Sequence, residues 1–274
     1  MLRGRFLKVD VILLTKNSEK PCLKKCLDSI YKNVPVCHLI VVDGGSTDNT
    51  LKIVSQYPNV IIIYDSNGNR ATARQKGIET VDSEWFMFVD SDVILCEDWF
   101  KKAWNLVQDD VGAIWGVAVP LKKSWYNRVK AIAKLYRKSI LDLLVERPRL
   151  RRYLTHDTLI RREAVEGIKI PRYLHVWEDH YIGNYIVTKG YKWINTKNPY
   201  CLHYANERRT IQDNMLNGMF ARKMGLIKTK DIIMKMTWIL PKSMWIIAST
   251  GDFIAGLNEF KNFVYLFKGW LSCK

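Results

Sequence analysis

Short apolar segments that alternate with helical segments are the feature of this 274-residue sequence that most restricts its fold. The apolar segments cover residues 9–14, 39–42, 60–64 and 85–89, and they contain almost no alternating polar residues. Helical patterns follow the first three, for example over residues 71–80. Near-continuous apolar strands separated by helices are typical of a parallel sheet covered on both faces. The sequence therefore predicts an α/β fold with a doubly wound, mostly parallel sheet.

Polar side chains follow three of these predicted strands at the points where the strands end. The clusters are Thr15-Lys16-Asn17-Ser18, Asp43-Gly44-Gly45-Ser46 and Asp90-Ser91-Asp92. In open α/β sheets, ligands bind beyond the carboxyl ends of the strands. We therefore expect the three clusters to converge on one crevice that binds a ligand.

Asp90 and Asp92 are the sharpest local signal for a cation site. Two carboxylates two residues apart at a strand end can turn toward one ion, and Mg²⁺ or Mn²⁺ prefers such oxygen ligands and keeps positions for phosphate. The alternative is a pair of surface acids, because the pattern alone is common by chance. An EF-hand is excluded, since its third acid and its glycine are missing. The position after the fourth predicted strand favours the metal site.

Glu178 and Asp179 form a second acidic pair, at the start of a helix predicted over about residues 178–189. Carboxylates at a helix start are favoured by the helix dipole, which is one sufficient explanation of the pair. A catalytic carboxylate is the alternative, and the two residues alone do not distinguish them.

The charge of the chain is uneven along its length. The sequence has 43 Lys+Arg and 27 Asp+Glu residues, a net charge of +16. Residues 1–119 hold 14 basic and 15 acidic residues, whereas residues 120–153 hold 11 and 2, and residues 207–274 hold 11 and 5. Such basic segments fit either an anionic lipid surface or a nucleic acid.

The first basic segment also contains apolar residues at helical spacing. This stripe consists of Trp125, Val129, Ile132, Tyr136, Ile140 and Leu143, and the opposite face has Arg128, Lys130, Lys134, Arg137 and Lys138. Three interpretations are open: a helix in a bilayer interface, a helix packed on its own domain, and a nucleic-acid contact. The interface is favoured, because no nucleic-acid-binding motif is present. Trp125, Trp238, Trp245 and Trp270 would then be interfacial anchors.

The remaining features concern the location of the protein. The longest apolar region, residues 236–255, is interrupted by Pro241, Lys242 and Asp252, and the first residues lack the apolar stretch of a signal peptide. The six cysteines form no CxxC pair, which favours reduced thiols over a metal site. We therefore expect a cytoplasmic protein, peripheral on the cytosolic face of a membrane.

Five motifs in order resemble those of family 2 glycosyltransferases. They are Thr15-Lys16-Asn17 at the first strand end, VVDGGSTDNT over residues 41–50, Asn67-Gly68 with Ala73-Arg74-Gln75-Lys76-Gly77, Phe88-Val89-Asp90-Ser91-Asp92, and Trp177-Glu178-Asp179 with Lys189-Gly190-Tyr191-Lys192. They span residues 8–195, about 70% of the chain. Gly44 and Gln75 depart from the family pattern, and neither removes a proposed metal ligand.

The resemblance implies a role for each matched residue. Thr15, Asn17, Asp43, Arg74 and Asp90 would bind the nucleotide-sugar donor. The metal ligands would be Asp90, Asp92 and, as in some relatives, His203, for which a purely structural role is equally open. Asp179 would be the general base, and Glu178 belongs to the same catalytic pair.

The resemblance also implies a function and a domain arrangement. It implies a GT-A fold and an inverting hexosyltransferase that uses Mn²⁺ or Mg²⁺ to move a sugar from a UDP- or GDP-sugar to a hydroxyl or lipid-phosphate acceptor, on a glycan or a lipid. The catalytic domain would cover residues 1–206, with a donor half at 1–119 and an acceptor half at 120–206 that includes the basic insert 120–153. Residues 207–274 would form a helical tail at an anionic membrane surface, without nucleic acid. The alternative is a basic membrane- or nucleic-acid-binding protein without transferase activity.

Overall fold

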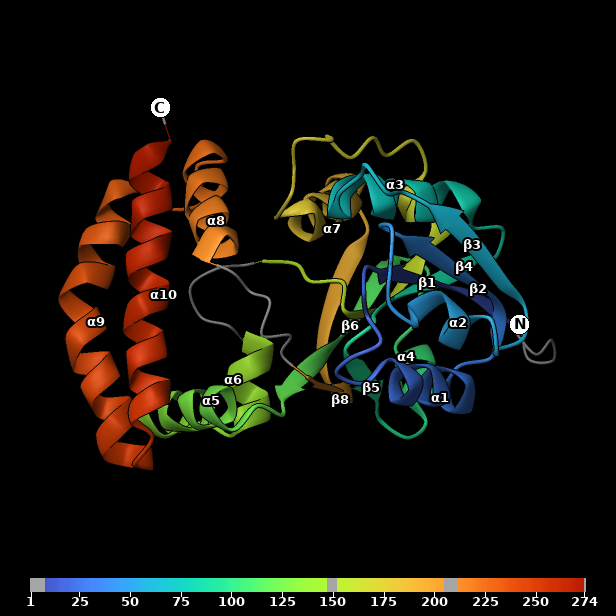
Figure 1. The fold of residues 1–274 in the computed structure, drawn as a ribbon. Coiled ribbons are helices and arrows are strands. Elements are labelled where there is room, and N and C mark those ends of the chain that lie inside the picture. Colours follow the sequence, from blue (N-terminus) through green and yellow to red (C-terminus); the bar gives the residue numbers. More distant parts are fainter. Residues whose placement is uncertain (1–7, 147–151, 205–210, 274) are drawn as a thin grey trace. The chain divides into compact units, whose positions relative to one another are not determined.

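The computed structural model describes residues 8–146, 152–204 and 211–273. Residues at the very N-terminus, residues 147–151 of the predicted basic insert and residues 205–210 around the predicted domain boundary lie outside this part. The chain forms two compact units, which we call the sheet unit (residues 1–119 and 152–204) and the helical unit (residues 120–151 and 205–274). Figure 1 shows their elements.

The sheet unit contains an eight-stranded sheet with the order β3-β2-β1-β4-β7-β6-β8-β5. The strands are β1 (Val9–Thr15), β2 (Val36–Asp43), β3 (Val60–Tyr64), β4 (Trp85–Asp90), β5 (Val93–Leu95), β6 (Val111–Pro120), β7 (Asp157–Arg161) and β8 (Lys192–His203). Strand β1 pairs in parallel with β2 and β4, and β2 with β3. The pairs β4–β7, β6–β7 and β5–β8 are antiparallel. The predicted α/β fold is confirmed, but the sheet is mixed, because β1 to β4 pair in parallel whereas the three pairs that involve β7 or β5 are antiparallel.

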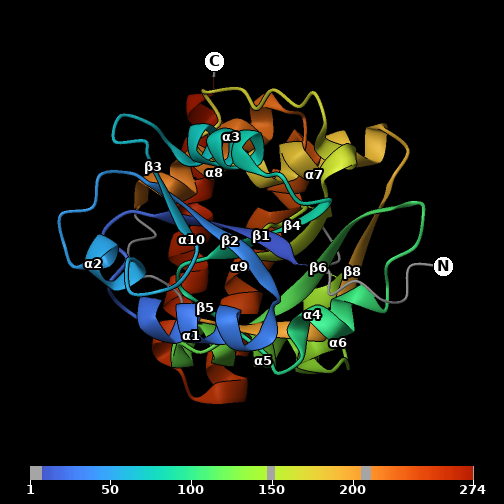
Figure 2. The same ribbon diagram turned by 90° about the vertical axis from the view of Figure 1, so that its right-hand side faces the viewer.

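Helices cover both faces of this sheet. They are α1 (Leu23–Asn33), α2 (Thr50–Val54), α3 (Arg70–Thr80), α4 (Trp99–Trp104) and α7 (Glu178–Thr188), with a short 3₁₀ helix at Arg162–Val165. Helices α3 and α7 lie on one face, and α1 and α4 on the other (Figure 1; Figure 2). Leu23, Leu27 and Ile30, predicted to share one helix face, are fully buried in the core under α1. Burying such side chains stabilises the unit by about 1.5–3 kcal/mol each.

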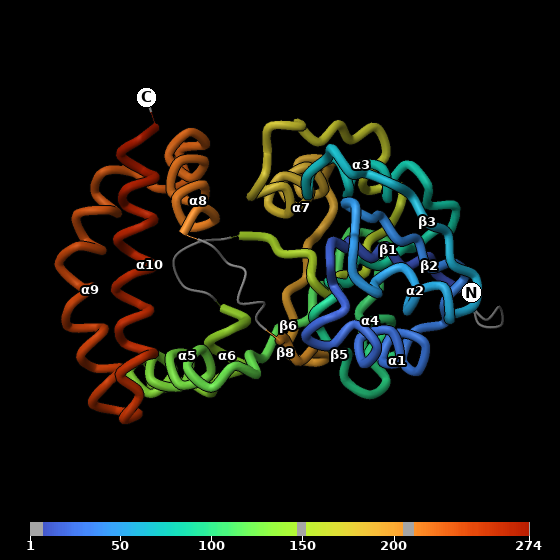
Figure 3. The backbone as a smooth tube through the Cα atoms, in the orientation of Figure 1, coloured from blue at the N-terminus to red at the C-terminus, as the bar shows by residue number. Residues whose placement is uncertain are grey.

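The helical unit contains α5 (Lys123–Leu135), α6 (Ile140–Glu146), α8 (Ile211–Lys223), α9 (Thr229–Thr250) and α10 (Phe253–Ser272). Helices α9 and α10 run side by side from the turn at Gly251 (Figure 3). The predicted helical character of the tail is therefore confirmed, with α8, α9 and α10 in its described residues. The prediction of a single helix from Trp125 to Leu143 is wrong. Helix α5 ends at Leu135, and Arg137 adopts a positive φ of 54°.

Helix α5 is held to the tail helices by polar contacts. The Trp245 indole donates to the Ala131 carbonyl at 2.8 Å, and Glu259 of α10 pairs with Arg128 at 3.1 Å and Lys242 at 2.6 Å. Burial raises the pKa of Glu259, but these two cations outweigh it, so its pKa lies below the usual range. Arg128 therefore binds Glu259 inside the bundle. The prediction that Arg128 lies on the exposed basic face is wrong.

These contacts explain why the basic segment groups with the tail in the helical unit, whereas the sequence-based division placed it in the catalytic domain. The exposure of the tryptophans also corrects the predicted interfacial anchors. Trp270 is 7% exposed, and its indole donates to the Ile227 carbonyl, whereas Trp238 is 55% exposed. No helix in the described residues is both long and apolar enough to cross a bilayer.

Candidate active site

The predicted convergence of polar strand ends is present at one edge of the sheet. Thr15 of β1 pairs in register with Asp43 of β2, and Leu14 pairs with Asp90 of β4. The ends of β1, β2 and β4 therefore lie side by side, because β1 is hydrogen-bonded to both of its neighbours. This register brings the proposed donor-binding residues to one place.

Asp43 organises the loop after β2. Its carboxylate is fully buried and accepts hydrogen bonds from the Thr15 hydroxyl at 2.8 Å and from the Gly45 and Ser46 amides at 3.0 and 2.8 Å. Gly45 has a φ of +84°, a left-handed conformation that favours glycine. Asn17 joins the same loop by accepting from the Thr47 amide at 2.7 Å. Thr15, Asn17 and Asp43 thus belong to one hydrogen-bonded network, which we call the donor slot. The predicted contact of Asp43 with a nucleotide base stays a prediction.

Asp92 faces His203 across the neighbouring strands. Val93 of β5 pairs with His203 of β8, which places the imidazole Nε2 3.3 Å from an Asp92 carboxylate oxygen. Both side chains are slightly under one-fifth exposed, and the Asp90 side chain is 36% exposed. Carboxylate oxygen and imidazole nitrogen are ligands that Mn²⁺ accepts. Asp92 and His203 therefore fit a divalent ion that remains accessible to a diphosphate.

A buried group of polar side chains, His156, Asp157 and Trp99, lies next to His203. The His156 and His203 rings lie 5.8 Å apart, His156 Nδ1 lies 2.6 Å from Asp157, and Trp99 donates to Asp157 at 3.0 Å. Burial raises the pKa of Asp157 well above its usual range. The spacing of His156, Asp157 and Cys201 would suit a metal ion. However, His156 Nε2 already accepts from the Trp115 indole at 3.1 Å, so this group serves better as a support than as a second metal site.

Arg74 of α3 links the two acidic pairs. Its guanidinium donates to Glu178 at 3.2 Å and to Asp90 at 3.5 Å, and it lies 4.8 Å from the centre of the Phe88 ring. The side chains of Arg74 and Glu178 are 6% and 4% exposed. Burial and, next, the charge of Asp179 raise the pKa of Glu178, although Arg74 lies beside it. Arg74 therefore joins the loop Asp90-Ser91-Asp92, which we call the DxD loop, to the start of α7.

Asp179, in the first turn of α7, is bound by Arg152. Arg152 Nη2 donates to both carboxylate oxygens at 3.1 Å, and its guanidinium stacks 4.4 Å from the Trp177 ring. Trp177 has a φ of 74°, which is rare for a bulky residue. The neighbouring Tyr153 packs its ring directly against Gly183 of α7. A Cβ at position 183 would lie only 2.2 Å from that ring, so the close contact requires glycine. The predicted base is thus engaged in this conformation.

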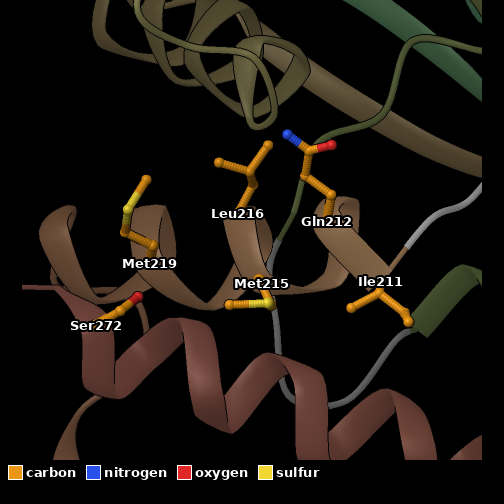
Figure 4. Close-up of a pocket in the computed structure, with 6 residues that line it drawn as sticks. All are labelled: Ile211, Gln212, Met215, Leu216, Met219 and Ser272. Atoms are coloured by element: carbon orange, nitrogen blue, oxygen red, sulfur yellow. The ribbon is translucent and has the colours of Figure 1, made fainter.

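Two pockets differ in their relation to these residues. A pocket of about 410 Å³ follows the end of β3 and is lined by Tyr64, Asp65, Ser66, Asn67, Gly68, Thr72, Lys76 and Arg172. It adjoins the donor slot, since the Asp65 amide donates to the Asp43 carbonyl at 2.7 Å. A groove of about 670 Å³ in the helical unit is lined by Ile211, Gln212, Met215, Leu216, Met219 and Ser272 (Figure 4). None of its lining residues belongs to the predicted site.

Sequence reasoning missed the contact between Arg152 and Asp179. Arg152 was counted as one of the basic residues of segment 120–153, and nothing in its Arg151-Arg152 context distinguishes it from its neighbours. The pair forms because the chain returns to the sheet unit at Arg152, directly before β7, and lies along the start of α7. Only the three-dimensional arrangement shows this.

Several known proteins are similar to this chain. Glycosyltransferase GlyA of Streptococcus pneumoniae serotype 4 is 33% identical over 103 residues, which is 35% of this chain and 14% of GlyA. An uncharacterized glycosyltransferase of Haemophilus influenzae is 22% identical over 61% of this chain and 67% of its own length. For the first three curated relatives, the matched region covers only 14–26% of their length.

The fold agrees with a solved structure and with a family model. The mannosyltransferase PcManGT from Pyrobaculum calidifontis, in complex with GDP-Man and Mn²⁺, superposes with a TM-score of 0.63 at 18% identity and covers 96% of this chain and 86% of its own. The family model described as Glycosyl transferase family 2 matches residues 10–169, more than half of the chain. The chain therefore belongs to glycosyl transferase family 2.

Proposed function

We propose that this protein is an inverting glycosyltransferase that moves a sugar from a UDP- or GDP-sugar to a hydroxyl or a lipid phosphate, with Mn²⁺ or Mg²⁺ as cofactor. The observation behind the proposal is the arrangement of Asp92 with His203 at the sheet edge, joined through Asp90 and Arg74 to Glu178 and Asp179. This arrangement supports a site in which a metal-bound diphosphate and a catalytic carboxylate would lie in one unit.

The donor side would bind the nucleotide in the slot formed by Thr15, Asn17 and Asp43. Asp92 and His203 would hold the divalent ion, with Asp90 beside them. When bound, such an ion stabilises the negative charge that develops on the diphosphate leaving group. The rigid loop after β2 fixes the position of the nucleotide and thereby orients the sugar toward α7.

The acceptor side would use Asp179 as general base. An acceptor hydroxyl has a pKa far above 7 and needs a carboxylate within hydrogen-bond reach as it attacks. Attack on the side opposite to the leaving group inverts the anomeric centre. Arg152 donates to both oxygens of Asp179, and protonation of the carboxylate weakens such an ion pair, so we expect this contact to loosen when the acceptor proton is taken up.

Relatives support the donor and leave the acceptor open. The complexes of PcManGT with GDP-Man and Mn²⁺ and of S. aureus TarS 1–349 with UDP-GlcNAc, the latter at a TM-score of 0.58, show both nucleotides on this fold. A relative named poly(ribitol-phosphate) beta-glucosyltransferase, 28% identical over 38% of this chain and 18% of its own, suggests a phosphate-bearing acceptor. We further propose that the protein is peripheral on the cytosolic face of an anionic membrane, where a lipid-linked acceptor would be within reach.

A screen of UDP- and GDP-sugars for metal-dependent hydrolysis tests the proposal. We expect release of the nucleoside diphosphate from at least one donor with Mn²⁺ or Mg²⁺, and its loss on chelation. The alternative, a basic binding protein without transferase activity, predicts no release from any donor under any metal condition. Both arms use the full chain, and circular dichroism confirms that an inactive preparation is folded.

A further inference from the structure

The side of α9 that faces away from the helical bundle is apolar and exposed. Ile233, Leu240 and Met244 recur at helical spacing and are 57%, 59% and 68% exposed. Ile232, Ile239 and Ile246 occupy the opposite side and are buried. We call the exposed stripe of Ile233, Leu240 and Met244 the α9 face. Residues at positions i, i+7 and i+11 share one face of a helix.

Further exposed apolar residues lie elsewhere on α9 and at the start of α10. Trp238 is 55% exposed, and Phe253 and Ile254, directly after the turn at Gly251, are 64% and 63% exposed. No acidic residue occurs from Ile232 to Gly251. Soluble proteins rarely expose large contiguous apolar patches unless the patch is an interaction site. We therefore expect the exposed apolar residues of α9 to be covered by a partner.

The charge of the helical unit restricts what that partner can be. This unit has 21 basic and 7 acidic residues, a net charge of +14, whereas the sheet unit has 22 and 20. Several of the acids are engaged internally: Glu259 pairs with Arg128 and Lys242, and Asp252 caps α10 by accepting from the Ala255 amide at 2.9 Å. Lys130 and Lys134 on α5 are exposed. The unit is therefore complementary to an anionic partner.

We propose that the α9 face docks into the interface of an anionic lipid bilayer, with α9 lying on the membrane and not crossing it. An interfacial helix buries its apolar side at the boundary between headgroups and acyl chains, while nearby cations bind anionic lipid. This inference rests on the membrane partner proposed above and is independent of sugar transfer. It replaces the predicted stripe of residues 125–143, in which Val129 of α5 and Leu143 of α6 are buried.

Two other occupants fit the surface less well. A nucleic acid would contact basic and polar side chains, whereas the α9 face is uncharged and apolar. A second copy of this chain would place two units of net charge +14 against each other. Of these three occupants, the bilayer is the one that matches both the apolar face and the positive charge.

Vesicle flotation tests the proposal. We expect the full chain to float with vesicles of equal parts phosphatidylcholine and phosphatidylglycerol, less with phosphatidylcholine alone, and less as salt is raised. Ile233→Ser, Leu240→Ser and Met244→Ser combined should lower the partition coefficient at least about a hundredfold, since burying each side chain contributes on the order of tenfold. A matched control, Ile61→Ser with Val187→Ser and Leu271→Ser, should bind as the wild type does.

Independent measurements keep the test decisive. Vesicles should shift the emission of Trp238 to shorter wavelength, and Trp238→Phe should remove the shift. Lys130→Glu with Lys134→Glu should weaken binding to the anionic vesicles only. The proposal is overturned if the wild type does not float at low salt, if the triple variant binds normally, if duplex DNA binds and vesicles do not, or if light scattering shows a dimer that the triple variant dissociates. Flotation does not depend on turnover, so an inactive transferase would leave this result unchanged.

Discussion

Asp179→Asn is expected to lower turnover at least about a hundredfold, the usual contribution of a general base, while donor affinity changes little. Asp179 lies in the first turn of α7, and its neighbour Glu178 is joined through Arg74 to the DxD loop. An asparagine keeps the shape of the side chain but cannot accept the acceptor proton. The measurement is steady-state transfer with the donor found in the screen, together with calorimetry of nucleotide binding.

Arg152→Met is the matched control, because it breaks the same ion pair without removing the carboxylate. We expect it to retain far more turnover than Asp179→Asn. Equal losses in the two variants would show that the ion pair, not the base, supports activity, and would contradict the assignment. A lipid-phosphate acceptor is already ionised, so for that acceptor the effect of Asp179→Asn should be much smaller, and its size reports the acceptor class.

Arg74→Met is expected to cost about 3–5 kcal/mol of unfolding free energy, the usual effect of removing one partner of a buried ion pair. The effect should come mainly from Glu178, which is 4% exposed, because the side chain of Asp90 is 36% exposed and 3.5 Å away. Without Arg74, Glu178 must either remain buried as an uncompensated charge or bind a proton. Urea unfolding of the full chain at neutral pH measures the loss.

Adding Glu178→Gln to Arg74→Met distinguishes this cause from lost packing against Phe88. The double variant has no uncompensated charge and should recover a substantial part of the lost stability. If it is no more stable than Arg74→Met alone, the packing of the arginine stem explains the effect. An unchanged unfolding free energy in Arg74→Met would contradict the linking role of this arginine.

The first half of the fold was predictable from sequence because its interactions are strong and local. Buried parallel strands are apolar along their whole length, and the polar residues at their ends are therefore conspicuous, as at Thr15, Asp43 and Asp90. The antiparallel half was not predictable in this way. Strand β8 pairs with β5 across about 100 residues of sequence, and ten of its twelve residues are exposed or partly exposed, so it lacks the buried apolar pattern of β1, β2 and β4.

The site and the tail show the same limit. The ligand pair of Asp92 and His203 depends on that long-range pairing, and the contact between Arg152 and Asp179 joins residues with no shared motif. The periodicity of residues 125–143 indicated one helix, whereas the structure has two, α5 and α6, and periodicity does not say what an apolar face packs on. In the structure α5 uses its apolar face inside the bundle, and the uncovered face belongs to α9.

Calorimetric titration of UDP and GDP into the full chain, with and without Mn²⁺, tests the central claim most directly. We predict Mn²⁺-dependent binding of one nucleotide to the wild type, and its loss in Asp92→Asn and weakening in His203→Ala, with unchanged circular dichroism. Nucleotide affinity that is the same in chelator as in Mn²⁺, or the same in Asp92→Asn as in the wild type, would contradict a metal-bound diphosphate at this sheet edge.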